Sequence, residues 1–148
     1  MELNEPVTTV LKNKNGRICS IAASDSVYDA IAMMSRESVG ALLVLDGGKL
    51  EGIVSERDYA RKVILLGRSS KSTTVGEIMT APVIVVSPRA TVGECMEIIS
   101  QHRIRHLPVL DEGRVLGVIS IGDLVNWVLE EQSDHIRHLE AYIRTQAG

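Results

Sequence analysis

The chain contains an internal repeat with an offset of 65 residues. Residues 27–58 align with residues 92–123 without a gap, and 10 of the 32 aligned positions carry the same residue. The segment Gly-Ile-Val-Ser-Glu-Arg-Asp, which ends at Asp58, returns as Gly-Val-Ile-Ser-Ile-Gly-Asp, which ends at Asp123. Self-similarity of this kind indicates that one supersecondary unit occurs twice. Because a Ser and an Asp recur together with the apolar positions, the repeat also predicts a duplicated site.

Each copy is predicted to fold as strand, helix, strand, strand, helix, which gives an α+β fold (β-α-β-β-α). Ser26 followed by Asp29, and Thr91 followed by Glu94, are helix-start patterns ahead of apolar residues. Turn residues after Asp46 and Asp111 predict a hairpin in each copy. The predicted strands are 18–22, 42–45, 50–54, 83–86, 107–110 and 115–119, and the predicted second helices are 57–66 and 121–130.

These elements predict five segments along the chain. They are a polar N-terminal segment at 1–17, the first repeat at 18–67, a linker at 68–80, the second repeat at 81–131 and a C-terminal helix at 132–148. In the last segment, Ile136, Leu139 and Ile143 recur at spacings of three and four. This spacing predicts an apolar stripe that packs on the chain's own core or on a partner chain.

Composition excludes several classes of protein. The net charge is −3 and no basic block occurs, so the sequence does not indicate nucleic-acid binding. No apolar run reaches the roughly 18 residues of a membrane span, and the acidic N-terminus lacks a signal-peptide core. The two cysteines have no metal or redox spacing, which indicates buried thiols in a reducing compartment. We therefore predict a cytoplasmic protein.

The Ser-x-x-Asp pairs Ser55/Asp58 and Ser120/Asp123 have two interpretations. In the simpler one they are helix N-caps, in which Ser accepts a backbone hydrogen bond and the acid favours the positive helix end. In the other, the helix start holds a phosphate and the carboxylate accepts the hydroxyls of a ribose. Gly52 and Gly117, three residues earlier, would let the backbone approach a ligand.

The repeated Gly-h-h-Ser-x-x-Asp motif, in which h is apolar, resembles that of CBS domains, which occur in tandem as Bateman modules. The segments 102–109, His-Arg-Ile-Arg-His-Leu-Pro-Val, and 75–80, Val-Gly-Glu-Ile-Met-Thr, are also typical of that family. The resemblance covers about residues 18–130. It implies that two repeats pack with pseudo-twofold symmetry and form two clefts for AMP, ADP, ATP, NAD or S-adenosylmethionine. It also implies a homodimer.

The resemblance further implies roles for single residues. Asp58 and Asp123 would each hold a ribose, while Ser55 and Ser120 would contact ribose or phosphate. Arg105 and His106 would reach the phosphate in the Asp58 cleft, although His106 is equally well explained as a structural histidine.

The residue roles that the resemblance implies also make the two clefts chemically unequal. The first-repeat counterparts of Arg105 and His106 are Gly40 and Ala41, which carry no charge. The Asp123 cleft would therefore take its phosphate contact from Arg57, whose own counterpart, Gly122, offers only backbone. The residues flanking the adenine rings would be Val39 and Ile104.

The main prediction is a stand-alone regulatory module that binds an adenine nucleotide, preferably AMP, without a metal, and signals occupancy to a partner protein. The first alternative is a dimerisation or docking scaffold with non-functional clefts. The second is an enzyme such as a nucleotide hydrolase, but the sequence shows no nucleophile beside a general base and no metal constellation.

Overall fold

The computed structural model describes residues 3–14 and 17–147. The described chain divides into two compact units, which we name after the aspartate that each contains. The Asp58 unit comprises residues 17–85 and 110–116, and the Asp123 unit comprises the described parts of 1–16, 86–109 and 117–148.

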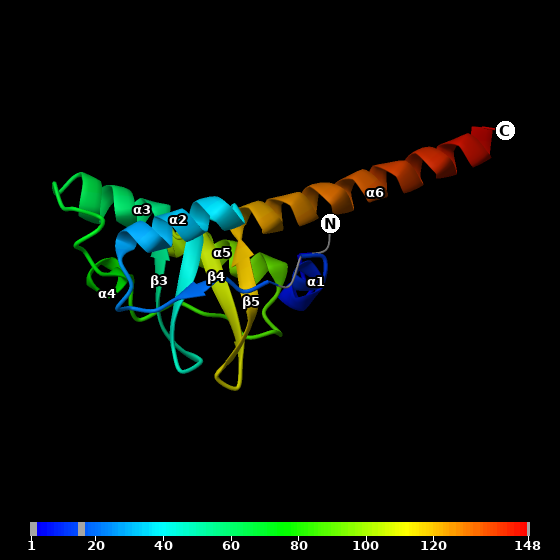
Figure 1. The fold of residues 1–148 in the computed structure, drawn as a ribbon. Coiled ribbons are helices and arrows are strands. Elements are labelled where there is room, and N and C mark those ends of the chain that lie inside the picture. Colours follow the sequence, from blue (N-terminus) through cyan, green and yellow to red (C-terminus); the bar gives the residue numbers. More distant parts are fainter. Residues whose placement is uncertain (1–2, 15–16, 148) are drawn as a thin grey trace. The chain divides into compact units, whose positions relative to one another are not determined.

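A three-stranded sheet organises the Asp58 unit (Figure 1). β1 (Ser20–Ile21) runs parallel to β2 (Ala41–Asp46), which pairs antiparallel with β3 (Lys49–Ser55). The turn between β2 and β3 contains Gly47 and Gly48, with φ values of 57° and 84°. Two consecutive residues with positive φ form the turn that matches the twist of a hairpin, which explains the glycine pair.

Helices bury the apolar side chains of this unit. They are α2 (Val27–Glu37), α3 (Glu56–Tyr59), a π-helical turn η1 (Ala60–Ile64) and α4 (Val75–Ile78). Ser26 accepts a hydrogen bond from the backbone N–H of Asp29 and so caps α2, as the sequence predicted. The core is almost wholly aliphatic and consists of Ile21, Val27, Ala30, Met34, Leu42, Val44, Val54, Val63, Val75 and Ile78.

The Asp123 unit contains the corresponding elements of the second repeat. α5 (Val92–His102) precedes the hairpin strands β4 (His106–Asp111) and β5 (Arg114–Ser120), whose tip belongs to the Asp58 unit, and α6 (Ile121–Ala147) follows. Val86 forms a parallel bridge to Val109. The buried apolar side chains of this unit include Val7, Val10, Val86, Val92, Cys95, Ile99, Leu107, Val109, Ile119, Leu124 and Trp127.

The structure confirms the repeat. The bounds of α5, β4 and β5 are those of α2, β2 and β3 shifted by 65 residues. The residues that end α2 and α5, Ser38 and Arg103, both have left-handed backbone conformations, with φ values of 56° and 54°. The duplicated sequence pattern therefore specifies duplicated local structure down to the helix ends.

The segment that precedes the second repeat packs on the first repeat. Thr73 accepts a hydrogen bond from the backbone N–H of Val27 at 2.9 Å, and the backbone N–H of Val75 donates to Asp25 O at 2.8 Å. Thr73 is itself buried, and Val75 and Ile78 belong to the core. The predicted linker 68–80 is therefore an integral part of the Asp58 unit.

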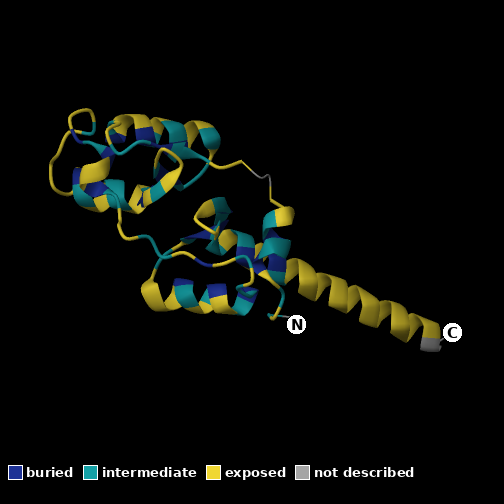
Figure 2. Ribbon diagram, turned by 90° about the horizontal axis from the view of Figure 1, so that it is seen from below, coloured by how far each residue is buried: buried dark blue, intermediate teal, exposed yellow. Residues whose placement is uncertain are grey.

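The segment that precedes the first repeat packs on the second repeat in the same way. α1 (Val7–Lys12) starts with a hydrogen bond from the backbone N–H of Val7 to Ala90 O, 2.7 Å long. The backbone N–H of Val92 donates to Glu5 O at 2.8 Å. We expected a polar, partly ordered segment at 1–17, but its described residues form this helix and bury two valines (Figure 2). Each repeat is thus completed by the segment that precedes the other repeat. We call residues 1–17 and 68–80 the leading segments of the first and second repeat.

Four further expectations differ from the structure in detail. The predicted strand 18–22 is reduced to two residues, and the predicted strand 83–86 retains only the bridge at Val86. The predicted helix 57–66 begins at Glu56 and changes to π-helical geometry at Ala60. The two helices predicted at 121–130 and 132–148 are one continuous α6 of 27 residues.

Candidate functional site

Ser55 and Asp58 form a reciprocal capping box at the start of α3. The backbone N–H of Ser55 donates to Asp58 Oδ2 at 3.0 Å, and the backbone N–H of Asp58 donates to Ser55 Oγ at 3.2 Å. Two backbone donors that a helix start leaves without partners are thereby satisfied. The capping interpretation of the Ser-x-x-Asp motif is therefore confirmed for the first repeat.

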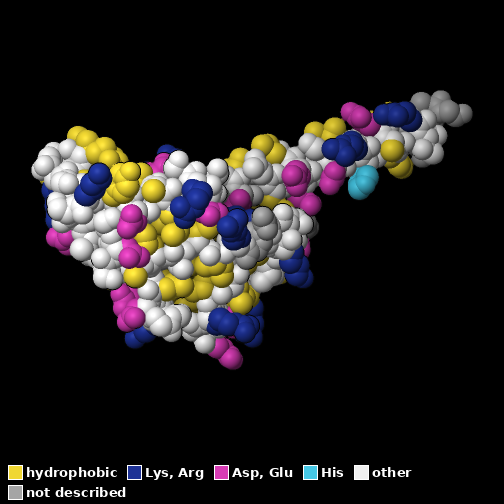
Figure 3. All heavy atoms as spheres, viewed as in Figure 1, with side chains coloured by type: hydrophobic (Ala, Val, Ile, Leu, Met, Phe, Trp, Pro, Cys, Tyr) yellow, Lys and Arg dark blue, Asp and Glu magenta, His cyan; other side chains and the backbone are white. Residues whose placement is uncertain are grey.

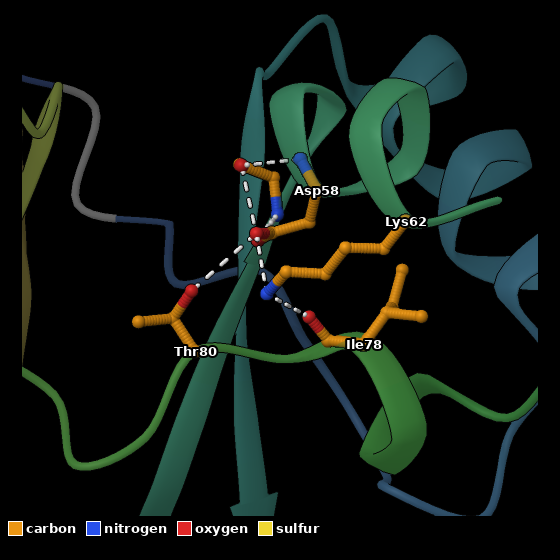
Figure 4. Close-up of polar contacts among 5 residues, drawn as sticks. Asp58, Lys62, Ile78 and Thr80 are labelled. Atoms are coloured by element: carbon orange, nitrogen blue, oxygen red, sulfur yellow. Dashed lines mark hydrogen bonds and ion pairs between the residues drawn. The ribbon is translucent and has the colours of Figure 1, made fainter. Parts of the chain in front are cut away.

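The other side of the Asp58 carboxylate faces a lysine and a threonine (Figure 4). Lys62 Nζ lies 3.1 Å from Asp58 Oδ1 and also donates to Ile78 O at 2.9 Å. Thr80 Oγ1 donates to the same Oδ1 at 3.4 Å. Thr80 follows α4, so this carboxylate joins the helix start to the segment that leads into the second repeat.

Ser120 and Asp123 repeat the box at the start of α6. The backbone N–H of Ser120 donates to Asp123 Oδ2 at 2.9 Å, and the backbone N–H of Asp123 donates to Ser120 Oγ at 3.1 Å. The capping interpretation thus holds at both repeat positions, with nearly equal distances. The local geometry does not distinguish the two sites, so any difference between them must come from the surrounding side chains.

Lys14 makes the main difference between the surroundings of Asp123 and those of Asp58. Its ammonium lies 2.7 Å from Asp123 Oδ2 and donates to Val118 O at 2.7 Å. The side chains of Lys14 and Asp123 are 37% and 25% exposed. Partial burial raises the pKa of Asp123, but the hydrogen bond and charge of Lys14 and the Ser120 backbone N–H outweigh it, so the pKa is lowered overall. Asp123 is therefore ionised at neutral pH and carries a bound counter-charge.

His106 belongs to the same electrostatic environment. Burial lowers its pKa, and the positive charges of Lys14 and Arg105 act in the same direction, while Asp123 opposes them. His106 is half-buried at the start of β4. Both the structural interpretation of this histidine and its role at the Asp58 cleft stay predictions.

The two repeated glycines make room for protein rather than for a ligand. A Cβ at Gly52 would lie 2.6 Å from Met79 Sδ and 3.1 Å from Thr80 O. A Cβ at Gly117 would lie 2.8 Å from Leu11 Cδ2. The expectation that these glycines allow a ligand to approach was therefore wrong on this face, because the leading segments fill the space.

The remaining predicted site residues lie around the two helix starts of their own units. Gly40 O accepts from the backbone N–H of Glu56, and Arg105 O accepts from that of Ile121, each at the first residue of the helix. Val39 packs against the Asp58 core. Ile104 is half-buried, whereas the side chain of Arg57 and the backbone at Gly122 are exposed. The proposed reach of Arg57 and Arg105 to the opposite aspartate stays a prediction.

Sequence reasoning missed Lys14, Lys62 and Thr80. Lys62 had a readable signal, because it stands four residues after Asp58 on a predicted helix and this spacing favours an ion pair. No spacing in the sequence pointed to Lys14, because 109 residues separate it from Asp123. Only the packing of α1 on the second repeat brings it there.

Comparison with known proteins identifies the family. The CBS domain model matches residues 6–64 and 75–130. The chain belongs to the CBS domain family. Both matches begin at or within a leading segment, upstream of the repeats expected at 18 and 81. The α+β fold and the two CBS repeats that the motif predicted are therefore confirmed.

Relatives of this CBS protein include proteins with little beyond a CBS pair. The mitochondrial CBS domain-containing protein CBSX3 of Arabidopsis thaliana is 42% identical over 93% of this chain and 71% of its own. YhcV of Bacillus subtilis is 27% identical over 86% of this chain and 91% of its own. A solved CBS-domain protein of Burkholderia ambifaria, whose name assigns it to signal transduction, is 52% identical with a TM-score of 0.83, covering 86% and 96%.

These similarities support a regulatory CBS protein without fixing its ligand. Inosine-5'-monophosphate dehydrogenase of Nitrosopumilus maritimus also matches, but the alignment covers only 27% of that enzyme. Within the described residues, no group of three or more His, Cys, Asp or Glu side chains is placed to hold a metal ion. No helix in the described part of the chain is long and apolar enough to cross a membrane.

Proposed function

We propose that this CBS protein is a regulatory module that binds adenine nucleotides at the starts of α3 and α6 and signals their presence to a partner protein. One observation carries the proposal. Asp58 and Asp123 stand at equivalent repeat positions, each fixed by its serine at a helix start, and each has a lysine ammonium within 3.1 Å.

The Asp123 carboxylate retains acceptor capacity for a ribose, whereas a ribose at Asp58 would have to replace one of its contacts with Ser55, Lys62 or Thr80. An ionised carboxylate has about four lone-pair sites. In the Asp123 box, both Ser120 and Lys14 bind Oδ2, which leaves Oδ1 to accept from a ribose hydroxyl. The capping bonds hold the carboxylate in one orientation, so a ribose would meet a preorganised acceptor at little further entropic cost.

The lysines fit the phosphate end of a nucleotide. A helix start and a nearby ammonium both favour an anion. Lys14 is the strongest candidate for phosphate contact beside Asp123, and Lys62 is its counterpart beside Asp58. Arg57 and Arg105 would add charge from the opposite repeat and His106 would add a further polar contact, as the family resemblance implies.

The two sites would bind unequally. Lys62 is held by Ile78 O and by its own helix, four residues from Asp58, whereas Lys14 comes from the leading segment. Adenine would pack beside Val39 or Ile104, with backbone contacts from Gly40 and Gly122. AMP is the proposed ligand, and ADP, ATP and NAD share the same adenosine monophosphate group.

Signalling would follow from the leading segments. Thr80 and Lys14 join each aspartate to a segment of the other repeat, so a ligand that replaces these contacts would favour a different arrangement of the chain. We further propose a cytoplasmic homodimer. A related CBS-CP12 protein of bloom-forming cyanobacteria, 31% identical with a TM-score of 0.72, is named as hexameric.

A scaffold without ligands is the second candidate. The observation that favours it is that both serine–aspartate pairs already have complete roles as helix caps. Under this interpretation, selection for capping alone would retain the motif. The two candidate functions differ in one testable respect. Only the nucleotide-binding module requires the carboxylate charge to contact a diffusible molecule.

Calorimetric titration with AMP, ADP, ATP, NAD and S-adenosylmethionine tests the proposal. We expect saturable binding of AMP that falls at least tenfold in the Asp58→Asn and Asp123→Asn double variant. The matched control is Asp46→Asn with Asp111→Asn, which changes a second repeated aspartate pair, exposed on the hairpins. Absence of binding by wild-type protein shown to be free of co-purified nucleotide supports the scaffold. Equal binding by both double variants would instead refute the two aspartates as the binding site.

A further inference from the structure

Lys62 differs from Lys14 in the carboxylate oxygen that it contacts. At Asp58, the backbone N–H and the hydroxyl of Ser55 donate to Oδ2 at 3.0 and 3.1 Å. Lys62 and Thr80 contact the other oxygen, Oδ1, at 3.1 and 3.4 Å (Figure 4). A carboxylate has about four lone-pair sites, and these contacts use all of them. A ribose that binds Asp58 must therefore replace contacts that are already made.

The lysine beside Asp123 contacts the same oxygen as its capping serine. Lys14 Nζ and the backbone N–H of Ser120 both contact Oδ2, at 2.7 and 2.9 Å. A ribose hydroxyl can donate to Oδ1 without displacing either of them. The position equivalent to Lys62 in the second repeat is Trp127, which is buried and carries no charge. The two repeats therefore differ in whether an ammonium occupies the oxygen that a ribose would use.

Replacement of the Lys62 ammonium by neutral hydroxyls is unfavourable at Asp58. The side chain of Asp58 is only 13% exposed, so water does little to stabilise its charge once the cation leaves. The side chain of Lys62 is 42% exposed and its ammonium also donates to Ile78 O, so it can move aside without losing every contact. A neutral nucleoside gives the displaced ammonium no new partner. A phosphate gives it an anion and keeps its charge near the carboxylate.

The surface charge as a whole does not favour an anion. The net charge of the chain is −3, and Figure 3 shows acidic side chains interspersed with basic ones. Selection of phosphate must therefore come from single residues near the ribose rather than from a large positive field. Lys62 is such a residue, because its contact with Asp58 holds it at the oxygen that a ribose would use.

We propose that Lys62 makes the Asp58 site selective for phosphorylated nucleosides, whereas the Asp123 site also accepts the unphosphorylated nucleoside. This selectivity rests on the proposed function, because it assigns a ligand class to each of the two aspartates. Lys62 excludes a nucleoside by occupying Asp58 Oδ1, and it contacts the phosphate of a nucleotide whose ribose has taken its place. Lys14 strengthens AMP binding at Asp123 but leaves the ribose free to bind without a phosphate.

Calorimetric titration with adenosine and AMP at pH 7 tests the selectivity in variants that keep one aspartate each. In Asp123→Asn, which keeps the Asp58 site, AMP should bind about a hundredfold more tightly than adenosine, because adenosine loses both the phosphate contact and the ion pair. In Asp58→Asn, which keeps the Asp123 site, the difference should be only about tenfold, because one charged contact is lost.

Lys62→Met in the Asp123→Asn background tests the assigned residue. Methionine keeps much of the aliphatic stem and removes the ammonium. Adenosine binding should strengthen at least tenfold and AMP binding should weaken, so that the two affinities become similar. A gain in adenosine affinity does not arise from loss of folding. The matched control is Lys71→Met, an exposed lysine of the same unit whose ammonium lies over the Tyr28 ring, and it should change neither affinity.

The outcomes separate the selectivity from the proposed function. If Lys62→Met leaves the ratio of the AMP and adenosine affinities unchanged, the role of Lys62 is refuted while nucleotide binding stands. If adenosine binds as tightly beside Asp58 as beside Asp123, the selectivity is refuted. If Asp123→Asn binds neither ligand although the wild-type protein binds AMP, the Asp58 site takes no nucleotide and the selectivity fails. If wild-type protein free of co-purified nucleotide binds neither ligand, the proposed function fails as well.

Discussion

The contact between Lys14 and Asp123 should couple the N-terminal segment to the second repeat. Two exposed charges in an ion pair contribute about 0.2–1 kcal/mol, and hydrogen bonds to charged groups contribute about 1.5–3 kcal/mol. This pair is partly exposed, with a 2.7 Å contact and a second bond to Val118 O. We therefore expect a coupling of about 1 kcal/mol, equivalent to about 2–4 °C in Tm for a chain of this size.

A double-mutant cycle measures that coupling. Urea denaturation at pH 7 would compare Lys14→Met, Asp123→Asn and the combined variant, because methionine keeps most of the aliphatic stem. Lys12→Met, an exposed lysine in α1, provides the matched control and should not couple to Asp123. A coupling below about 0.3 kcal/mol, which is the usual error of additivity, would refute the assigned contact.

The lowered pKa of Asp123 fixes the sign of the pH dependence. A carboxylate with a folded-state pKa below its unfolded value contributes stability that is present above the unfolded value and lost as pH falls through the folded one. The unfolded value is 3.8, so the coupling should be the same at pH 7 and pH 5. A coupling that disappears between these two pH values would contradict an ion pair of Asp123.

The Lys14→Met variant distinguishes a contact of Lys14 with phosphate from a structural role in orienting Asp123. If Lys14 contacts phosphate, Lys14→Met should weaken AMP binding about tenfold, which corresponds to about 1.4 kcal/mol, and leave adenosine binding unchanged. Equal weakening of both ligands would mean that Lys14 acts only by orienting Asp123. The comparison of the two ligands in one variant therefore needs no assumption about folding.

Three further predictions follow from the packing and the charges. Gly52→Ala should cost about 1–3 kcal/mol, because its Cβ would meet a backbone carbonyl as well as a sulfur, whereas Gly117→Ala meets only a flexible leucine end and should cost less in denaturant titrations. Burial lowers the pKa of His106 in the folded protein, so as pH falls below about 6.5 this imidazole is protonated in the unfolded chain before it is protonated in the folded one. The free energy of unfolding should therefore decrease from pH 7 towards acid. The His106→Leu variant should flatten that part of the stability–pH profile. Val7→Ala should destabilise the protein by about 2 kcal/mol, and a negligible effect would contradict the burial of α1.

The elements that the repeat covers could be predicted from sequence, because apolar periodicity and turn residues determine them locally. The hairpins after Asp46 and Asp111 and the caps at Ser26 and Thr91 are of this kind. The leading segments could not be placed in this way, because their role depends on contacts with the opposite repeat. One signal was present, since Val7-x-x-Val10-Leu11 and Val75-x-x-Ile78-Met79 match at an offset of 68 residues.

That second offset explains why the two aspartate sites differ although their boxes are nearly identical. The offset of 65 places Asp58 and Asp123 in the same local structure. The leading segments then bring different residues to them, Thr80 to the first and Lys14 to the second. The first site obtains its ammonium from its own helix, and the second from a segment that is distant in sequence. A ligand that displaces the ammonium at Asp58 therefore breaks its bond to Ile78 O at the end of α4, whereas one at Asp123 releases the end of α1. If nucleotide occupancy is signalled through a change in structure, each site has a contact with a leading segment that would transmit it.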